Sequence, residues 1–139
     1  MSEFALHSES GVHMTFHNRH VNADGWVMSY ALTVEAPGFR ADLRVDNPGF
    51  GQPPSVLFQE MAAEWSGWRG KKEWSAIEGE CDFSATADST GHISFTARLH
   101  PRPFPPYWSG EVALILEAGV LEQLAVSATA FFGRQPRDG

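Results

Sequence analysis

A long stretch in which apolar and polar residues alternate, positions 74–119, constrains this chain more than any other feature. The apolar or small positions before its first turn are Ile77, Gly79, Cys81, Phe83, Ala85 and Ala87. The same period of two continues after that turn in Ile93, Phe95, Ala97 and Leu99, and later in Trp108, Gly110, Val112, Leu114 and Leu116. This period is typical of strands with one buried and one solvated face. The stretch therefore predicts three antiparallel strands.

The turn between the first two of these strands sets their register. Residues 88–92 fit a three-residue hairpin loop that closes in a bulge, with Gly91 in the left-handed region. In this register Asp82 faces Arg98 and Glu80 faces His100, and both pairs lie on the solvated face.

The rest of the chain supplies more strands and two helices. Alternation at residues 4–7, 12–17, 26–36 and 39–45 predicts four further strands. Apolar stripes at helical spacing predict a helix with Leu57, Phe58, Met61, Ala62 and Trp65 inward, and a second with Leu121, Leu124, Ala125, Ala128, Phe131 and Phe132 inward. The sequence thus predicts an α+β fold, an antiparallel sheet of about six or seven strands with two helices packed on one face, in the order ββββ-α-βββ-α.

Length and charge limit the organisation and the partners. The 139 residues predict a single domain over residues 1–132, followed by a mobile tail at 133–139. A net charge of −7 argues against direct binding to nucleic acid or an anionic membrane, and it suits a basic protein partner. The N-terminal residues lack a signal-peptide pattern and no run reaches transmembrane length, so we expect a cytoplasmic protein.

Several motifs in the second half, together with Trp26 and residues 36–39, carry a resemblance. They are Trp74, Ile77-Glu78-Gly79, the D-x-x-G-H turn at 88–92, and Leu116-Glu117-Ala118-Gly119 followed by Leu121-Glu122. Over roughly residues 26–132 the chain resembles a family of short uncharacterised actinobacterial proteins. This resemblance implies a fold and brings no assigned activity.

More distantly, the layout is similar to immunity proteins encoded beside wall-associated polymorphic toxins. Those proteins also combine strands, a helix, an E-x-x-G-H-type hairpin and a closing helix, so this similarity implies binding and neutralisation of a toxin. The D-Q-T step that usually enters their last helix is replaced here by Ala118-Gly119-Val120.

The candidate binding surface starts from a row of carboxylates. Glu78, Glu80 and Asp82 share one predicted strand face, with Arg98 and His100 opposite. Such a row is most often an ordinary solvated sheet surface. The alternative is an acidic docking surface for a basic partner.

Aromatic residues extend the list of candidates. Trp74 falls out of phase with the buried positions, so it is either a binding hot spot or a cover for the helix end. The proline-rich residues 101–107 carry Phe104 and Tyr107, and they form either a recognition loop or a rigid connector. These candidates are interface residues, and no catalytic set accompanies them.

No cofactor or metal is expected. His7 and His13 are predicted cross-strand neighbours, but His13 and His17 lie about 13 Å apart along an extended strand, which is too far for one zinc ion to bridge. Cys81 is the single cysteine, so no disulfide can form within the chain and no CxxC site is present. Phosphate-binding glycine loops and a nucleophile elbow are absent from the sequence.

These observations favour a non-catalytic protein-binding domain, of the immunity type that neutralises a cognate toxin or effector. The alternative is a small-molecule-binding or accessory domain with a pocket between helices and sheet, beside Trp65 and Phe131. An enzyme ranks third. The chain is expected to be a monomer, or a homodimer formed through an edge strand such as residues 4–7.

Overall fold

The computed structural model describes residues 3–101 and 107–136 of the chain. Its strands and helices are β1 (Phe4–His7), β2 (His13–Val21), β3 (Val27–Ala36), β4 (Phe39–Asp46), α1 (Ser55–Ala63), β5 (Lys72–Ser75), β6 (Cys81–Ala87), β7 (His92–Leu99), β8 (Gly110–Glu117) and α2 (Leu121–Phe132), with a short 3₁₀ turn η1 (Ala118–Val120) before α2.

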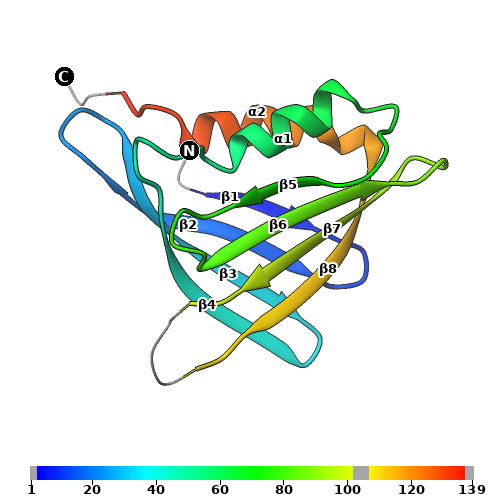
Figure 1. The fold of residues 1–139 in the computed structure, drawn as a ribbon, viewed down its shortest axis with the longest axis horizontal. Coiled ribbons are helices and arrows are strands. Elements are labelled where there is room, and N and C mark those ends of the chain that lie inside the picture. The colour runs from blue at the N-terminus through cyan, green and yellow to red at the C-terminus, as the bar shows by residue number, and fades with distance from the viewer. Residues whose placement is uncertain (1–2, 102–106, 137–139) are drawn as a thin grey trace.

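The strands form two four-stranded antiparallel sheets, β1-β2-β3-β4 and β5-β6-β7-β8 (Figure 1). The α+β class, the antiparallel pairing and the two helices are confirmed. The strand count is eight, and the strands form two sheets where one was expected. The additional strand is β5, which a turn at residues 76–80 separates from β6. Alternation identifies the buried side of a strand, but it does not say which sheet the strand joins.

The register of the central hairpin is confirmed. Asp82 pairs with Arg98 across β6 and β7, and Ala87 pairs with Ile93 next to the turn. Gly91 has a φ of 84°, a backbone conformation that suits glycine. The Asp88 carboxylate accepts hydrogen bonds from the backbone N–H groups of Thr90 and His92, which fixes this loop locally.

The two sheets face each other across an aromatic core. The rings of Phe16 on β2 and Phe83 on β6 meet edge to face, with centroids 5.8 Å apart. Phe83 also contacts Phe95 on β7, which stacks on Phe58 of α1. Such contacts add to the stabilisation from burial alone, so the sheets and α1 share one core.

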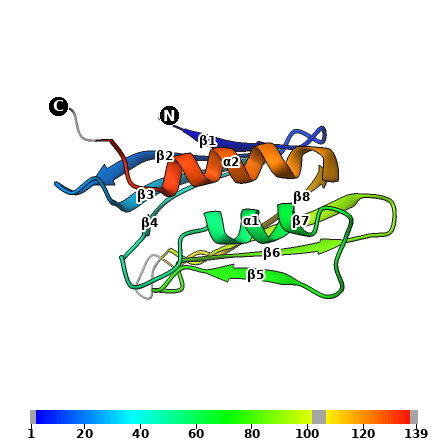
Figure 2. The same cartoon turned by 90° about the horizontal axis from the view of Figure 1, so that it is seen from above.

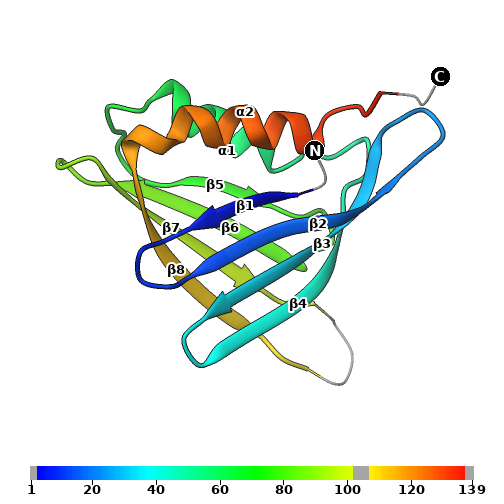
Figure 3. The same ribbon diagram turned by 180° about the vertical axis from the view of Figure 1, so that it is seen from behind.

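Both helices lie side by side along the edge where β1 and β5 are found (Figures 1 and 2). The chain repeats the order of four strands and a helix, yet each helix packs beside the first strand of the other half: α1 beside β5, and α2 beside β1. Seen from behind, β1 to β4 form one sheet beneath α2 (Figure 3). Phe132 of α2 contacts Phe4 and Phe16 of that sheet.

The sheets approach each other closely at β4. The Asp46 backbone N–H donates to Oε2 of Glu80 at 3.2 Å, which links the end of β4 to the residue before β6. At the other end of β4, a Cβ placed on Gly110 of β8 would lie 2.9 Å from the Phe39 ring. The missing side chain at Gly110 therefore permits this approach.

Two tryptophans lie outside the core that the apolar stripes predicted. Trp65 is 65% exposed because α1 ends at Ala63, before the stripe reaches it. Trp26 is 51% exposed because it precedes β3, whose first buried residue is Val27.

The C-terminal segment contacts the β2–β3 turn where a mobile tail was expected. Gln135 N donates to the Gly25 carbonyl at 2.6 Å, and Arg134 Nε donates to the Asp24 carbonyl at 2.7 Å. Residues 137–139 lie outside the described part of the chain. Among the described residues, no helix has the length and apolarity needed to cross a lipid bilayer.

Candidate functional site

An open groove of about 560 Å³ lies between the end of β4, the β5–β6 turn and the end of β7. Its lining is mostly ionisable: Arg44, Asp46, Glu78, Gly79, Glu80, His100 and Pro101. The structure thus brings together Glu78, Glu80 and His100 of the predicted surface, and it adds Arg44 and Asp46 from the other sheet. Sequence periodicity could not find those two residues, because they belong to a strand 30 or more positions away along the chain.

Glu80 is the groove residue whose placement differs most from expectation. It is only 8% exposed, and it precedes β6 as part of the turn. In that turn Gly79, with a φ of 74°, donates to the Ala76 carbonyl, and Ala76 donates to the Cys81 carbonyl. The turn interrupts the alternation, so the prediction that Glu80 faces solvent is wrong. Its side chain instead reaches the Asp46 backbone N–H across the gap between the sheets.

Two buried polar atoms lack hydrogen-bond partners among the described residues. They are Oε1 of Glu80, a residue that lines the groove, and the hydroxyl of Tyr30, a residue that does not. Burial raises the pKa of Tyr30 well above its usual range, and the charges of Cys81 and Glu80 raise this pKa further. Burial likewise raises the pKa of the Cys81 thiol. Tyr30 and Cys81 therefore stay protonated and neutral at ordinary pH.

The other two members of the predicted carboxylate row differ in exposure. Glu78 is exposed in the β5–β6 turn, whereas Asp82 is partly buried on β6. His100 Nε2 lies 4.0 Å from Asp82 Oδ2, so the expected side-chain pairing of His100 with Glu80 is wrong. The backbone pairing of these two residues does form, since His100 N donates to the Glu80 carbonyl at 2.7 Å. Arg98 makes its ion pair with Glu111 of β8.

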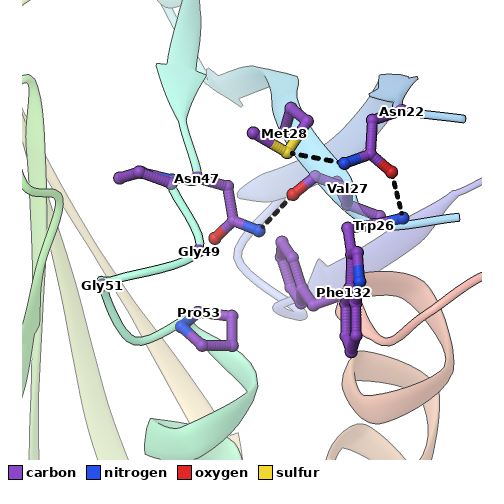
Figure 4. A pocket seen from close by; sticks show the side chains of 10 residues that line it. Asn22, Trp26, Val27, Met28, Asn47, Gly49, Gly51, Pro53 and Phe132 are labelled. Carbon is purple, nitrogen blue, oxygen red and sulfur yellow. Dashed lines mark hydrogen bonds between the residues drawn. The ribbon is translucent and has the colours of Figure 1, made fainter. Parts of the chain in front are cut away.

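A second hollow, of about 410 Å³, lies beside the end of α2 (Figure 4). Its walls include Trp26, Val27, Met28, Pro53 and Phe132, with Asn22 and Asn47 as polar groups. Asn47 Nδ2 donates to the Val27 carbonyl at 2.7 Å and thereby ties the β4–α1 loop to β3. This pocket is not beside Trp65 and Phe131, where the sequence placed one. The sequence could not locate this pocket, because Trp26 and the glycine- and proline-rich residues 47–54 lie more than 20 positions apart in the chain.

Comparison with known proteins supplies a family. The model of DUF6228, a family of unknown function, matches residues 5–135. The chain belongs to the DUF6228 family. The expectation of an uncharacterised family covering most of the chain is confirmed, and this match gives no link between DUF6228 and immunity proteins. Searches of curated proteins and of solved structures give no significant match.

The three aromatic candidates of this DUF6228 chain differ in where the structure places them. Trp74 is 7% exposed, stacks on Phe83 at 5.1 Å and donates to the Gln52 carbonyl at 2.6 Å, so it belongs to the core and covers the loop before α1. Tyr107 is 68% exposed. Phe104 lies outside the described residues. Trp74 is out of phase because β5 and β6 are separate strands.

Histidines occupy the outer face of the first sheet of the DUF6228 fold. His7 and His13 are cross-strand neighbours as predicted, with their Nδ1 atoms 2.6 Å apart. His17 Nε2 lies 2.8 Å from the Thr33 hydroxyl, which donates to Asp42 at 2.6 Å. The hydrogen bond from Thr33 and then that from Arg40 lower the pKa of Asp42. Within residues 3–101 and 107–136, no group of three or more His, Cys, Asp or Glu side chains could hold a metal ion.

Proposed function

We propose that this DUF6228 chain is a non-catalytic protein-binding domain whose partner is basic, and that it acts as an immunity-type protein on a cognate toxin or effector. The groove between β4 and the β5–β6 turn carries this proposal. Asp46, Glu78 and Glu80 place three carboxylates around a hollow that holds one guanidinium, that of Arg44.

The charges favour a cationic partner. Nε and Nη2 of Arg44 both donate to the Ser29 hydroxyl, which directs this guanidinium toward the neighbouring strand β3. The whole chain carries a net charge of −7, so its long-range field also attracts basic proteins. Charged groups of this kind increase the rate of association and the selectivity for partners of opposite charge.

A pull-down from the native host tests this proposal. The tagged chain is incubated with lysate at low and at high salt, and retained proteins are identified by mass spectrometry. We expect one basic partner, retained at low salt and weakened at high salt, because salt screens exposed charges over about 10 Å at 0.1 M.

Charge reversal then locates the interface. Asp46→Lys combined with Glu78→Lys should release the partner, since both side chains are exposed at the groove. Glu60→Lys is the matched control, because Glu60 is exposed on α1, which does not line the groove. Equal retention by the two variants would contradict the assignment of this groove as the interface.

The pocket beside Phe132 favours a second candidate function, the binding of a small apolar molecule. Pockets of this volume with aromatic walls and a few polar groups are typical of ligand sites. Its apolar walls and the two asparagines suit a flat, mostly apolar molecule with one or two hydrogen-bonding groups.

A screen of small aromatic compounds by tryptophan fluorescence tests this second candidate. A true ligand should change the emission of the native chain and lose its effect in Trp26→Ala. Trp65→Ala is the control, because Trp65 is also exposed and does not line the pocket. If a compound changes the emission of Trp26→Ala and of Trp65→Ala to the same extent, it binds outside this pocket.

A further inference from the structure

The carboxyl of Glu80 is incompletely paired although it is almost fully buried. Its Oε2 accepts the Asp46 N–H, while Oε1 has no partner in the described part of the chain. A buried carboxylate oxygen without a donor costs free energy, and the cost exceeds that of a neutral group. The Glu80 side chain lines the groove, so a donor entering the groove can remove this cost.

Tyr30 has the other buried polar atom without a partner among the described residues, its hydroxyl. Tyr30 does not line the groove, so this hydroxyl stays outside the proposed contact.

We infer that Glu80 forms the anchor site for a primary ammonium group, the side-chain end of a lysine from the basic partner. This inference rests on the proposed function and names the group that the groove selects. An ammonium has three donors, carries the charge that balances the carboxylate, and is compact on a slender stem. Those properties match one unpaired carboxylate oxygen on a residue that lines an open groove.

A guanidinium fits this anchor less well. Its planar fork binds a carboxylate best through both oxygens at once. Oε2 of Glu80 is already engaged by the Asp46 N–H, so the fork meets one free oxygen instead of two. Arg44 also lines the groove, and a second planar cation has to avoid it. The site therefore prefers lysine to arginine.

An NMR titration of the ¹⁵N-labelled full chain tests this inference with n-butylammonium, n-butylguanidinium and n-butanol as probes. The Asp46 amide is the reporter, because it donates to Glu80. We expect n-butylammonium to shift this resonance saturably, n-butylguanidinium to bind more weakly and n-butanol to leave it unchanged. Glu80→Gln should raise the Kd for n-butylammonium by about tenfold or more, as loss of a charge-assisted hydrogen bond does.

A control variant keeps the result interpretable. Glu60→Gln removes an exposed carboxylate away from the groove and should change the Kd by less than about twofold. If Glu80→Gln fails to fold, the comparison of the three probes on the native chain decides the question. Equal binding by the native chain and Glu80→Gln, or equal shifts with n-butanol, would overturn the inference.

The pull-down separates this inference from the proposed function. A partner that Glu80→Gln retains, but that the Asp46→Lys, Glu78→Lys variant releases, would leave the protein-binding proposal standing and refute the lysine anchor. Saturable n-butylammonium binding at Glu80 without any captured protein would support an ammonium site and refute the protein partner.

Discussion

Tyr30 is the largest side chain that the core buries completely among the described residues, and its hydroxyl has no hydrogen-bond partner among them. Its ring packs against Phe16 and Phe132, so the ring stabilises the fold while the hydroxyl opposes it. We expect Tyr30→Phe to raise the free energy of unfolding by about 1 kcal/mol, since it removes an unpaired buried group and keeps the packing.

Urea denaturation followed by circular dichroism measures this change. Phe16→Leu, which alters the neighbouring ring and no polar atom, is the control and should lower stability. A stability loss in Tyr30→Phe would mean that the hydroxyl is paired in solution.

Asp42 is a second single residue that affects stability, and its contribution depends on pH. Its pKa in the folded chain is lowered, first by the hydrogen bond from Thr33 and then by that from Arg40. A lowered folded pKa contributes stability that is fully present above the unfolded value of about 3.9 and is lost as the pH falls through the folded value.

Thr33→Val should therefore flatten the acid limb of the stability curve below about pH 4, because it removes the largest cause of the lowered pKa. The effect is small, since the Asp42 side chain is 58% exposed and solvent screens it. Urea denaturation between pH 2 and 5 measures the slope. An Asp42→Asn variant should show the same flattening, and an unchanged slope in both variants would contradict this role of Asp42.

At the scale of elements, the β2–β3 turn holds the end of the chain. Gly25 has a φ of 92°, and a Cβ there would collide with the Gln135 carbonyl oxygen. Gly38, in the β3–β4 turn, has a φ of 76° and no atom within 4 Å of such a Cβ. The two glycines thus share a backbone conformation that other residues rarely adopt, and they differ in their surroundings.

Gly38→Ala should cost about 1 kcal/mol from the backbone conformation alone, and Gly25→Ala should cost more because it also displaces the C-terminal segment. Amide hydrogen exchange at Gln135 measures the displacement, since this N–H donates to Gly25. We expect faster exchange at Gln135 in Gly25→Ala and unchanged exchange in Gly38→Ala. Unchanged exchange in both variants would show that the segment is not held by this turn.

The hairpin β6–β7 and the turn β5–β6 show what the sequence could reveal. The register of the hairpin was predictable because its loop is fixed by neighbouring residues, with Asp88 and Gly91 in their typical positions. The burial of Glu80 was not predictable, because it depends on Asp46 of the other sheet. The groove was not predictable for the same reason, since its two sides belong to different sheets and meet only when the sheets pack together.

At the scale of the whole molecule, the two halves are joined by their helices. Phe58 of α1 belongs to the first half by sequence, yet its ring stacks on Phe95 of the second half and meets Phe4 edge to face. We expect Phe58→Ala to lower the free energy of unfolding by about 3–5 kcal/mol. The transition should stay single, because the halves share one core.

Coincident urea curves from tryptophan fluorescence and circular dichroism measure that cooperativity. Val126→Ala, on the exposed side of α2, is the control and should change stability by less than about 0.5 kcal/mol. Two separated transitions in Phe58→Ala would show that the halves unfold independently.

The crossed placement of the helices also has a consequence for synthesis. The strand beside α1 is β5, which follows it in the chain, and the helix beside β1 is α2, which is the last element to be made. A growing chain on the ribosome therefore holds its first sheet without the helix that covers its edge until α2 has emerged. Until then the edge strand β1 is open to pairing with other chains.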